Sequence, residues 1–286
     1  MGGRVRFLVL DAYPREDRDA LEEAGGTRAG RLFERALVRI EPRAEVRVVY
    51  GADSDVPLPS RSELERYHGV AWTGSSLSVR RADDSRIRRQ IEFCREVLAS
   101  GVPGFGSCFA AQVCAVAAGG ECAPSPRGRE FGFARRVELS PSGRTHPLYR
   151  GKPAVFDAPA SHEDEIVRLP SEGELLASNA FSRVQALSVQ QAGGSFWAVQ
   201  YHPEFDLHAI ATLCRLRADD LARQGNFPDR ETALCYADDL EALHRDPSRS
   251  DLVRSLQLGS DVLDEELRTL ELRNWVEFQV RPRCVS

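Results

Sequence analysis

The sequence predicts an α/β fold: a mostly parallel sheet flanked by helices, with a small β-rich addition and a C-terminal helical extension. The first two-thirds of the chain alternates short apolar runs with helical patterns, which is typical of a sheet covered by helices. From about residue 130 to 200, segments with alternating apolar and polar residues indicate further strands. Beyond Asp206, Leu, Ala, Arg and Asp recur at helical spacing.

The N-terminal elements follow in the order strand, helix, strand. Residues 5–10, VRFLVL, are a continuous apolar run that predicts a buried strand. Residues 28–37 carry four apolar side chains at helical spacing, Leu32, Phe33, Ala36 and Leu37. Residues 45–51, EVRVVYG, predict the second strand.

Two further pairs of strand and helix complete a βαβαβα pattern. Residues 69–76, GVAWTGSS, predict the third strand, and residues 83–101 predict a capped amphipathic helix. The apolar face of that helix consists of Ile87, Ile91, Cys94 and Leu98. The segment VPGFGS then leads into a helix that starts at Cys108 and is ended by Gly119 and Gly120.

The remaining chain is β-rich and then helical. Ala-Gly-Gly-Ser between ALSVQQ and FWAVQY predicts a hairpin turn. The later helical patterns are broken at GNFPD and RDPSRSD and end in DEELRTLELRNWVEF. We expect one domain over residues 1–215 and a helical extension over 216–286 packed on it. Four apolar residues of the extension could dock a partner or a second copy, or form an ordinary packed face: Leu267, Leu270, Trp275 and Phe278.

Charge and composition exclude several classes of partner. The net charge is -5, and the basic residues are scattered, so there is no positive patch of the kind that binds nucleic acid. No apolar run approaches the roughly 20 residues of a membrane span, and the N-terminus turns charged too soon for a signal peptide, so we expect a cytoplasmic protein without membrane contact. The seven cysteines lack CxxC pairs and zinc-finger spacing, which indicates free thiols, with neither a disulfide framework nor a metal site.

Cys108 stands where a strand must turn sharply into a helix. In such a turn the residues two before and two after the central one must be small, and Gly106 and Ala110 satisfy this. The helix dipole and the free N–H groups of the first turn favour a thiolate at this position and later an oxyanion. The alternative is a small buried thiol, which is the commonest role of a cysteine.

His202 and Glu204 lie in the segment VQYHPEF, at the end of an apolar run. In an extended backbone, which Pro203 favours for the preceding residue, both side chains point to the same side. A histidine held by a carboxylate is the base that a nucleophilic cysteine requires, and it can also protonate a leaving amine.

The segment Thr73-Gly74-Ser75-Ser76 follows the third predicted strand. Its backbone N–H groups would then point into the crevice at the carboxyl end of a parallel sheet. The N–H of Ser75 can pair with that of Phe109 to form an oxyanion hole. Taken alone, the segment is only a turn.

In combination, these stretches resemble the class I, triad-type glutamine amidotransferases, especially the stand-alone group similar to the amidotransferase domain of GMP synthetase. The resemblance covers residues 5–206 and rests on T-G-S-S, P-x-x-G-x-C-x-x-x-Q, S-H-x-D and V-Q-Y-H-P-E. It implies a sheet of the flavodoxin-like or α/β-hydrolase-like kind. It also implies a triad of Cys108, His202 and Glu204 that attacks the side-chain amide of glutamine. The substrate-binding residues that it implies are Gly74, Gln112, Ser161, His162 and Asp164, although His162 could equally be structural.

Three positions depart from the family pattern. Ala110 replaces the usual Gly, Ser107 an aliphatic residue, and Ser75-Ser76 the common Gly-Pro. None of these changes removes a reacting group. At Ser75 the backbone N–H is retained, because Gly and Ser both have one.

The resemblance implies acyl transfer through a γ-glutamyl thioester, without a metal or organic cofactor, on glutamine or another γ-glutamyl compound. The chain has no SGGxDS segment or other recognisable nucleotide site, so an ammonia-consuming synthetase would be a separate partner. A hydrolase of γ-glutamyl peptides or γ-glutamyl amides that needs no partner is the alternative enzyme. A non-catalytic binding or regulatory subunit is disfavoured, because all three residue types of the triad are present. A homodimer is also compatible with the sequence.

Overall fold

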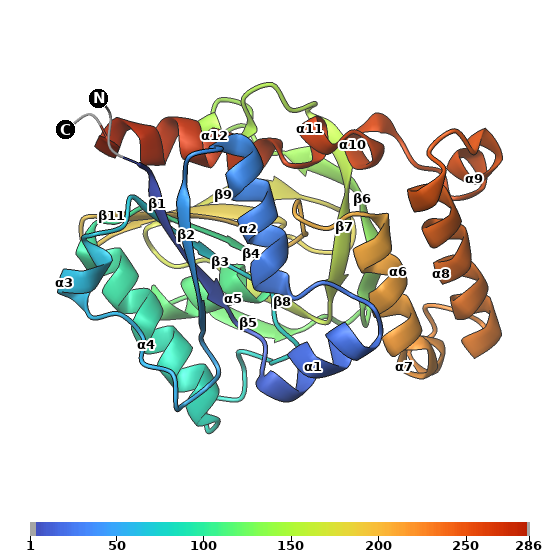
Figure 1. Ribbon diagram of the computed structural model, residues 1–286, viewed down its shortest axis with the longest axis horizontal. Helices are drawn as coiled ribbons and strands as arrows, with labels where there is room; N and C mark the ends of the chain where they lie inside the picture. The colour runs from blue at the N-terminus through green and yellow to red at the C-terminus, as the bar shows by residue number, and fades with distance from the viewer. Residues whose placement is uncertain (1–3, 285–286) are drawn as a thin grey trace.

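A nine-stranded sheet runs through the computed structural model, which describes residues 4–284 (Figure 1). From one edge to the other, its strands are β2 (Glu45–Tyr50), β1 (Arg6–Asp11), β3 (Gly69–Trp72), β4 (Gly104–Ser107), β11 (Gly194–Val199), β10 (Ala186–Gln191), β9 (Gly173–Ser178), β6 (Glu130–Leu139) and β7 (Val155–His162). The first five are parallel, and the other four continue the sheet in antiparallel pairing. The predicted fold class is confirmed, and its β-rich addition extends the main sheet.

A second, two-stranded sheet pairs β5 (Glu121–Pro124) with β8 (Asp164–Arg168). The α-helices of the first half are α1 (Arg15–Glu23), α2 (Ala29–Ile40), α3 (Arg61–Leu64), α4 (Ser85–Ser100) and α5 (Phe109–Ala117). Those of the second half are α6 (Leu207–Leu216), α7 (Ala218–Arg223), α8 (Arg230–Arg245), α9 (Ser250–Ser255), α10 (Ser260–Leu263), α11 (Glu265–Arg268) and α12 (Leu270–Trp275), followed by the π-helical turn η2 (Val276–Val280). Two 3-10 helices are η1 (Pro147–Tyr149) and η3 (Arg281–Cys284).

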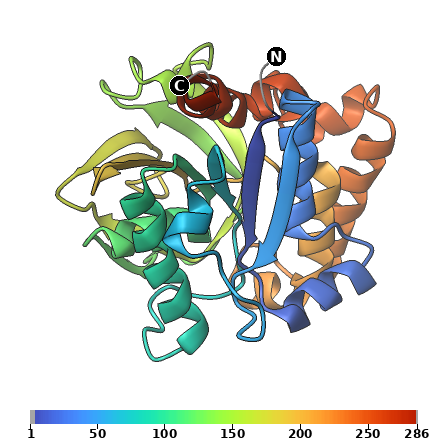
Figure 2. The same cartoon turned by 60° about the vertical axis from the view of Figure 1, so that its left-hand side comes forward.

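The sheet is covered on both faces because successive residues of a strand point to opposite sides. In β1, Phe7 and Val9 pack with α2 and α12, whereas Leu8 and Leu10 pack with α4 and α5. Figure 2 shows α4 and α2 on opposite sides of the N-terminal strands. This layering places the carboxyl ends of β1, β3 and β4 beside one another at one edge, as the sequence pattern predicted.

Several local predictions are also confirmed. Asp84 caps α4 by accepting the N–H of Arg86, and Gly101 ends the helix with φ 69°. The hairpin between β10 and β11 turns at Ala192 and Gly193, both with positive φ (53° and 86°), as the tight turn preferred by twisted strands requires.

Helix α1 was not predicted. Its sequence, REDRDALEE, has only one apolar residue that is buried, Leu21, so it shows no apolar stripe. The helix is held instead by Arg18, which is buried and donates to the carboxylate of Asp53 at 2.7 Å. A tertiary ion pair therefore holds this helix on the protein, where other helices are held by an apolar face.

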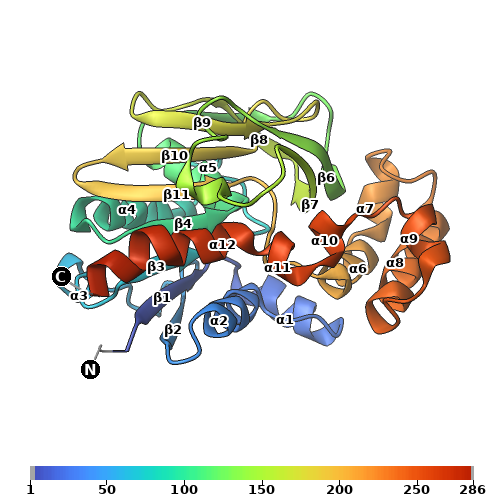
Figure 3. The same cartoon turned by 90° about the horizontal axis from the view of Figure 1, so that it is seen from above.

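The part of the chain after α6 contains helices and no strand within its described residues, 217–284. The expected division after residue 215 falls in the last turn of α6. Helix α8 packs on α6, while α12 returns along the main sheet (Figure 3). The ring of Trp275 lies 5.7 Å from that of Phe7 and 5.9 Å from that of Phe105, between centroids. Trp275 thus belongs to the interior. None of the helices in residues 4–284 is long and apolar enough to cross a membrane.

Candidate active site

Cys108 lies at the junction of β4 and α5 and has the strained backbone of a nucleophile turn, with φ 53° and ψ -107°. Its N–H donates to the carbonyl of Val199 at 2.8 Å, which fixes the turn to β11. A Cβ atom on Gly106 would lie 2.5 Å from the Cβ of Ala110, so the extra methyl of Ala110 leaves room only for glycine at position 106. Glycine at position 106, expected from the sequence, is therefore sterically required.

His202 and Glu204 form a buried pair. Nδ1 of His202 donates to Oε1 of Glu204 at 2.7 Å, and the imidazole stacks on Phe205 with centroids 3.9 Å apart and planes at 3°. The expectation of an extended strand here is wrong. The pair lies in a turn after β11, closed by a bond from Phe205 N–H to the carbonyl of His202. The two side chains meet through the turn, not through strand alternation.

Ser107 supplies a second donor to the same carboxylate. Its hydroxyl donates to Oε1 of Glu204 at 2.8 Å, although 97 positions separate the two residues. The other carboxylate oxygen, Oε2, is buried and has no hydrogen-bond partner among the described residues. Ser107, which departs from the family pattern, therefore contributes to the site because it orients Glu204. No local feature of the sequence predicted this contact.

The Cys108 side chain and the His202 ring meet beside Gly74. A Cβ atom on Gly74 would lie 2.6 Å from Cε1 of His202 and 3.5 Å from Cβ of Cys108, so a side chain there would displace the ring. Burial alone would lower the pKa of His202, but the charges of Glu204 and of a Cys108 thiolate outweigh it and raise the pKa to about 10. The surroundings of His202 therefore favour its protonated form. In the thiol form, Sγ donates to the carbonyl of Ser161 at 3.7 Å.

Replacing Glu204 with Gln is expected to lower the pKa of His202, because the variant loses the carboxylate charge that holds the imidazolium. A raised histidine pKa contributes stability that is complete below the unfolded value of about 6.5 and is lost as the pH rises through the folded value. The wild type should therefore keep its imidazolium, and the stability that it contributes, until the pH approaches 10. The variant should lose both at lower pH. NMR titration of the histidine ring nitrogens measures both values.

His208 provides the internal control for this titration. It bonds to Glu241 at 2.7 Å, away from Cys108, and should titrate alike in both proteins. An unchanged titration of His202 in the Glu204→Gln variant would contradict the electrostatic role assigned to Glu204.

Two backbone N–H groups are free to bind an anion. Those of Ser75 and Phe109 have no hydrogen-bond partner among residues 4–284, and both residues line the same pocket as Cys108. The Ser75 hydroxyl donates to the carbonyl of Ala12 at 2.9 Å, which holds the loop after β3 in place. Both N–H groups are therefore available to an oxyanion, which is the role that the sequence predicts for them.

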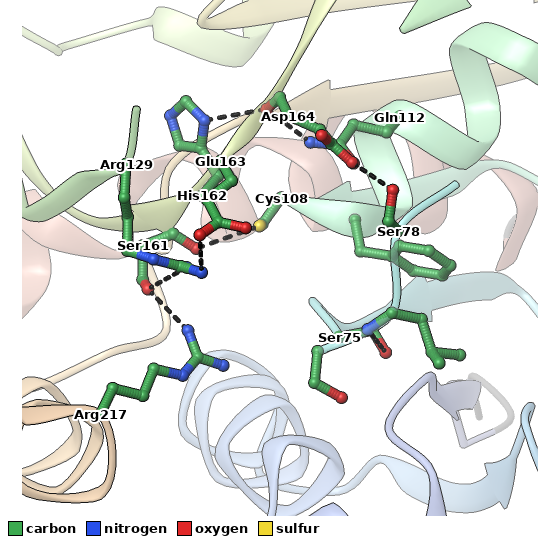
Figure 4. Close-up of a pocket in the computed structure, with 13 residues that line it drawn as sticks. Ser75, Ser78, Cys108, Gln112, Arg129, Ser161, His162, Glu163, Asp164 and Arg217 are labelled. Atoms are coloured by element: carbon green, nitrogen blue, oxygen red, sulfur yellow. Dashed lines mark hydrogen bonds and ion pairs between the residues drawn. The ribbon is translucent and has the colours of Figure 1, made fainter. Parts of the chain in front are cut away.

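The pocket encloses about 410 Å³ of empty space, partly open to solvent, and Figure 4 shows the side chains around it. Gln112 lines it, and its amide nitrogen donates to the carbonyl of Asp164 at 2.9 Å. The carboxylate of Asp164 is bound by the Ser78 hydroxyl and by Arg80 at 2.8 Å. Asp164 therefore joins β8 to the loop after β3 and has no free carboxylate to offer a ligand.

His162 also lines the pocket, but both of its ring nitrogens are bonded within the protein. Nε2 lies 2.8 Å from Oε2 of Glu130, and Nδ1 lies 3.0 Å from the carbonyl of Asp164. Glu130 further accepts from Asn179 and Gln185, each at 2.6 Å. This geometry favours the structural alternative for His162.

Two arginines in this pocket were not expected from the sequence. Arg129 lies just before β6, and Arg217 lies between α6 and α7. Both donate to the hydroxyl of Ser161, Arg129 at 3.5 Å and Arg217 at 3.1 Å (Figure 4). Neither belongs to a motif, and Arg217 comes from the second half of the chain, so no local signal pointed to them.

The chain is similar to a family of known enzymes. The sequence model of the family "Glutamine amidotransferase class-I" matches residues 45–212. A γ-glutamyl-L-1-hydroxyisopropylamide hydrolase from a Pseudomonas species is 31% identical over 98% of this chain and 94% of its own length. The GMP synthase of Thermomicrobium roseum is 38% identical over 48% of this chain but only 23% of that enzyme, and γ-glutamyl peptidase 3 of Arabidopsis thaliana is 27% identical over 53% of this chain and 60% of its own.

Solved structures share the fold at low sequence identity. A glutamine amidotransferase of Thermotoga maritima superposes with a TM-score of 0.64 and 16% identity, covering 97% of this chain and 99% of its own. A glutamine amidotransferase of Methylobacillus flagellatus superposes with a TM-score of 0.62 and 19% identity, covering all of this chain and 95% of its own.

Proposed function

Because the chain belongs to the class I glutamine amidotransferase family, whose enzymes use a cysteine to act on C–N bonds, we propose that it hydrolyses γ-glutamyl amides without a synthetase partner. The catalytic residues are Cys108, His202 and Glu204. The products are glutamate and the free amine.

The mechanism follows from the positions of these groups. The Cys108 thiolate adds to the γ-carbonyl carbon, and the N–H groups of Phe109 and Ser75 bind the resulting oxyanion. The C–N bond then breaks, and the imidazolium of His202 protonates the departing amine, which leaves a γ-glutamyl thioester on Cys108. His202 next takes a proton from water, the hydroxide attacks the thioester, and the thiolate returns with release of glutamate.

The observation that carries the proposal is the meeting of three features in one pocket: a strained cysteine, a buried imidazole–carboxylate pair and unpartnered N–H groups. The similarity to the Pseudomonas hydrolase extends over the C-terminal helices, which supports an amide hydrolase. Helix α6 and the segment after it also contribute Arg217 to the pocket, so this part of the chain belongs to the site.

The second candidate function is a glutaminase that supplies ammonia to a synthetase. Its support is the similarity of about half the chain to the glutamine-hydrolysing GMP synthase. Such an enzyme would use the same thioester chemistry, and a separate synthetase would consume the ammonia.

A substrate panel assayed on the isolated chain tests the two candidates. γ-Glutamyl isopropylamide, γ-glutamylalanine and glutamine are compared by amine or ammonia release. We expect kcat/KM for the isopropylamide to exceed that for glutamine by roughly tenfold or more, because a pocket selects among leaving amines by such factors. Preference for glutamine would support the second candidate, and inactivity on all three would contradict both.

A further inference from the structure

One wall of the pocket carries two guanidinium groups that face the same serine. Arg129 is well anchored: its Nη2 lies 2.8 Å from Oε1 of Glu163, and its Nε donates to the side-chain oxygen of Gln224 at 3.1 Å. Arg217 is different. Its polar partner among the described residues is the Ser161 hydroxyl at 3.1 Å, and no carboxylate of these residues lies within 4 Å of its guanidinium.

An unpaired cation in this position is electrostatically unfavourable. Both guanidinium groups contact the Ser161 hydroxyl, so two like charges lie close together. Burial, and then the positive charge of Arg217, lower the pKa of Arg129. An anion bound at Arg217 would relieve this repulsion and supply the missing partner. Arginine binds carboxylates well, because its planar N–H donors match the two carboxylate oxygens.

Both signs of charge are present at this wall. Glu163 lines the pocket beside Arg129, and 45% of its side chain is exposed. A positive Arg217 and a negative Glu163 together fit a ligand group that carries both charges, such as the α-amino acid end of a γ-glutamyl compound. A phosphate or another simple anion would be repelled by the negative charge of the Glu163 carboxylate.

The position of the wall relative to the sulfur fits the same ligand. The carbonyl of Ser161 accepts from Sγ of Cys108 at 3.7 Å, and its hydroxyl accepts from both arginines. Sγ of Cys108 and the two guanidinium groups therefore contact the same residue, Ser161, through its carbonyl and its hydroxyl oxygen. In a γ-glutamyl compound, two methylene groups and the α-carbon separate the reacting carbonyl from the α-carboxylate.

We propose that Arg217, supported by Arg129, binds the free α-carboxylate of the γ-glutamyl donor. This inference rests on the proposed function and names the group by which the site selects its substrate. Arg217 lies outside residues 45–212, the range matched by the family model, so the chain adds this binding residue to the shared triad site.

Three substrates and two variants test the assignment: two isopropylamides and γ-glutamylalanine. γ-Glutamyl isopropylamide is compared with 4-aminobutyryl isopropylamide, which lacks only the α-carboxylate, and neither has a carboxylate on the leaving amine. Arg217→Gln is compared with Arg223→Gln, a matched change on the exposed side of α7, where Arg223 pairs with Asp220. Binding is measured separately by calorimetry on the Cys108→Ala protein.

For Arg217→Gln, kcat/KM on the γ-glutamyl compound should fall roughly 10- to 100-fold, mainly through KM, because a charge-assisted hydrogen bond is lost. The 4-aminobutyryl compound should react as in the wild type, and Arg223→Gln should change neither rate. Calorimetry should show the same loss of affinity on the Cys108→Ala background.

Equal losses on both compounds, or no loss on either, would overturn the carboxylate assignment and leave the hydrolase function intact. An effect confined to γ-glutamylalanine, whose leaving group carries a carboxylate, would place Arg217 on the leaving-group side and also overturn it. A wild type that cleaves no γ-glutamyl compound would instead contradict the proposed function.

Discussion

Replacing Cys108 with Ala is expected to lower kcat/KM for γ-glutamyl isopropylamide by at least about 10⁴-fold, because triad enzymes lose activity by such factors when the nucleophile is removed. Alanine keeps the volume of the β4–α5 turn nearly unchanged but has no group that can form the thioester. The imidazole–carboxylate pair and the N–H groups of Ser75 and Phe109 remain, yet they have no attacking atom to assist. Amine release measured over hours gives the residual rate.

Cys114→Ala is the matched control, because Cys114 is a fully buried thiol on α5, the helix that Cys108 precedes. Burial raises the pKa of Cys114 well above its usual value, so this thiol is not a nucleophile. The control should keep its activity, and both variants should unfold cooperatively near the wild-type temperature. Mass spectrometry of the wild type during turnover should detect γ-glutamyl on Cys108. Full activity of the Cys108→Ala protein would contradict the mechanism.

The site was predicted best where local sequence determines local geometry. Gly106 and Ala110 around Cys108 predicted a tight turn, and the structure has one with φ 53° at Cys108. The segments that carry the other groups were also identified, because the carboxyl ends of neighbouring parallel strands meet at one edge of the sheet. Topology alone therefore brings Gly74, Cys108 and His202 together.

The contacts that tune the site could not be predicted from the sequence. The bond from Ser107 to Glu204 spans 97 positions, and the bond from Arg217 to Ser161 spans 56. Side-chain contacts of this kind depend on how the antiparallel half of the sheet and α6 pack. Periodicity reports which face of an element is apolar, but it does not report which polar groups meet.

The backbone that joins His202 and Glu204 could not be predicted from the sequence either. The prediction that these side chains meet is confirmed, whereas the extended backbone assumed for it is wrong. Spacing of two residues is compatible with both a strand and a tight turn. Sequence alone cannot distinguish them when a Pro lies between the two residues.

A buried ion pair joins α12 to the segment between η1 and β7. Nζ of Lys152 lies 3.0 Å from Oε2 of Glu271 on α12, and both side chains are almost completely buried. The hydroxyl of Tyr201 donates to Oε1 of Glu271 at 2.6 Å, and the Tyr149 hydroxyl lies 2.9 Å from that of Tyr201. Tyr201 directly precedes His202, so Glu271 on α12 contacts the residue next to the proposed base.

Glu271→Ala should therefore lower the free energy of unfolding by about 3–5 kcal/mol, because it leaves the ammonium of Lys152 buried and unpaired. Urea denaturation measures this loss, and Glu277→Ala is the control, since its exposed ion pair with Arg281 should be worth at most about 1 kcal/mol. A double variant, Lys152→Met with Glu271→Leu, removes both charges. Its free energy of unfolding should be higher than that of Glu271→Ala, because apolar replacements of a buried ion pair are often tolerated. A Glu271→Ala protein as stable as the Glu277→Ala control would show that the pair does not hold α12 on the sheet.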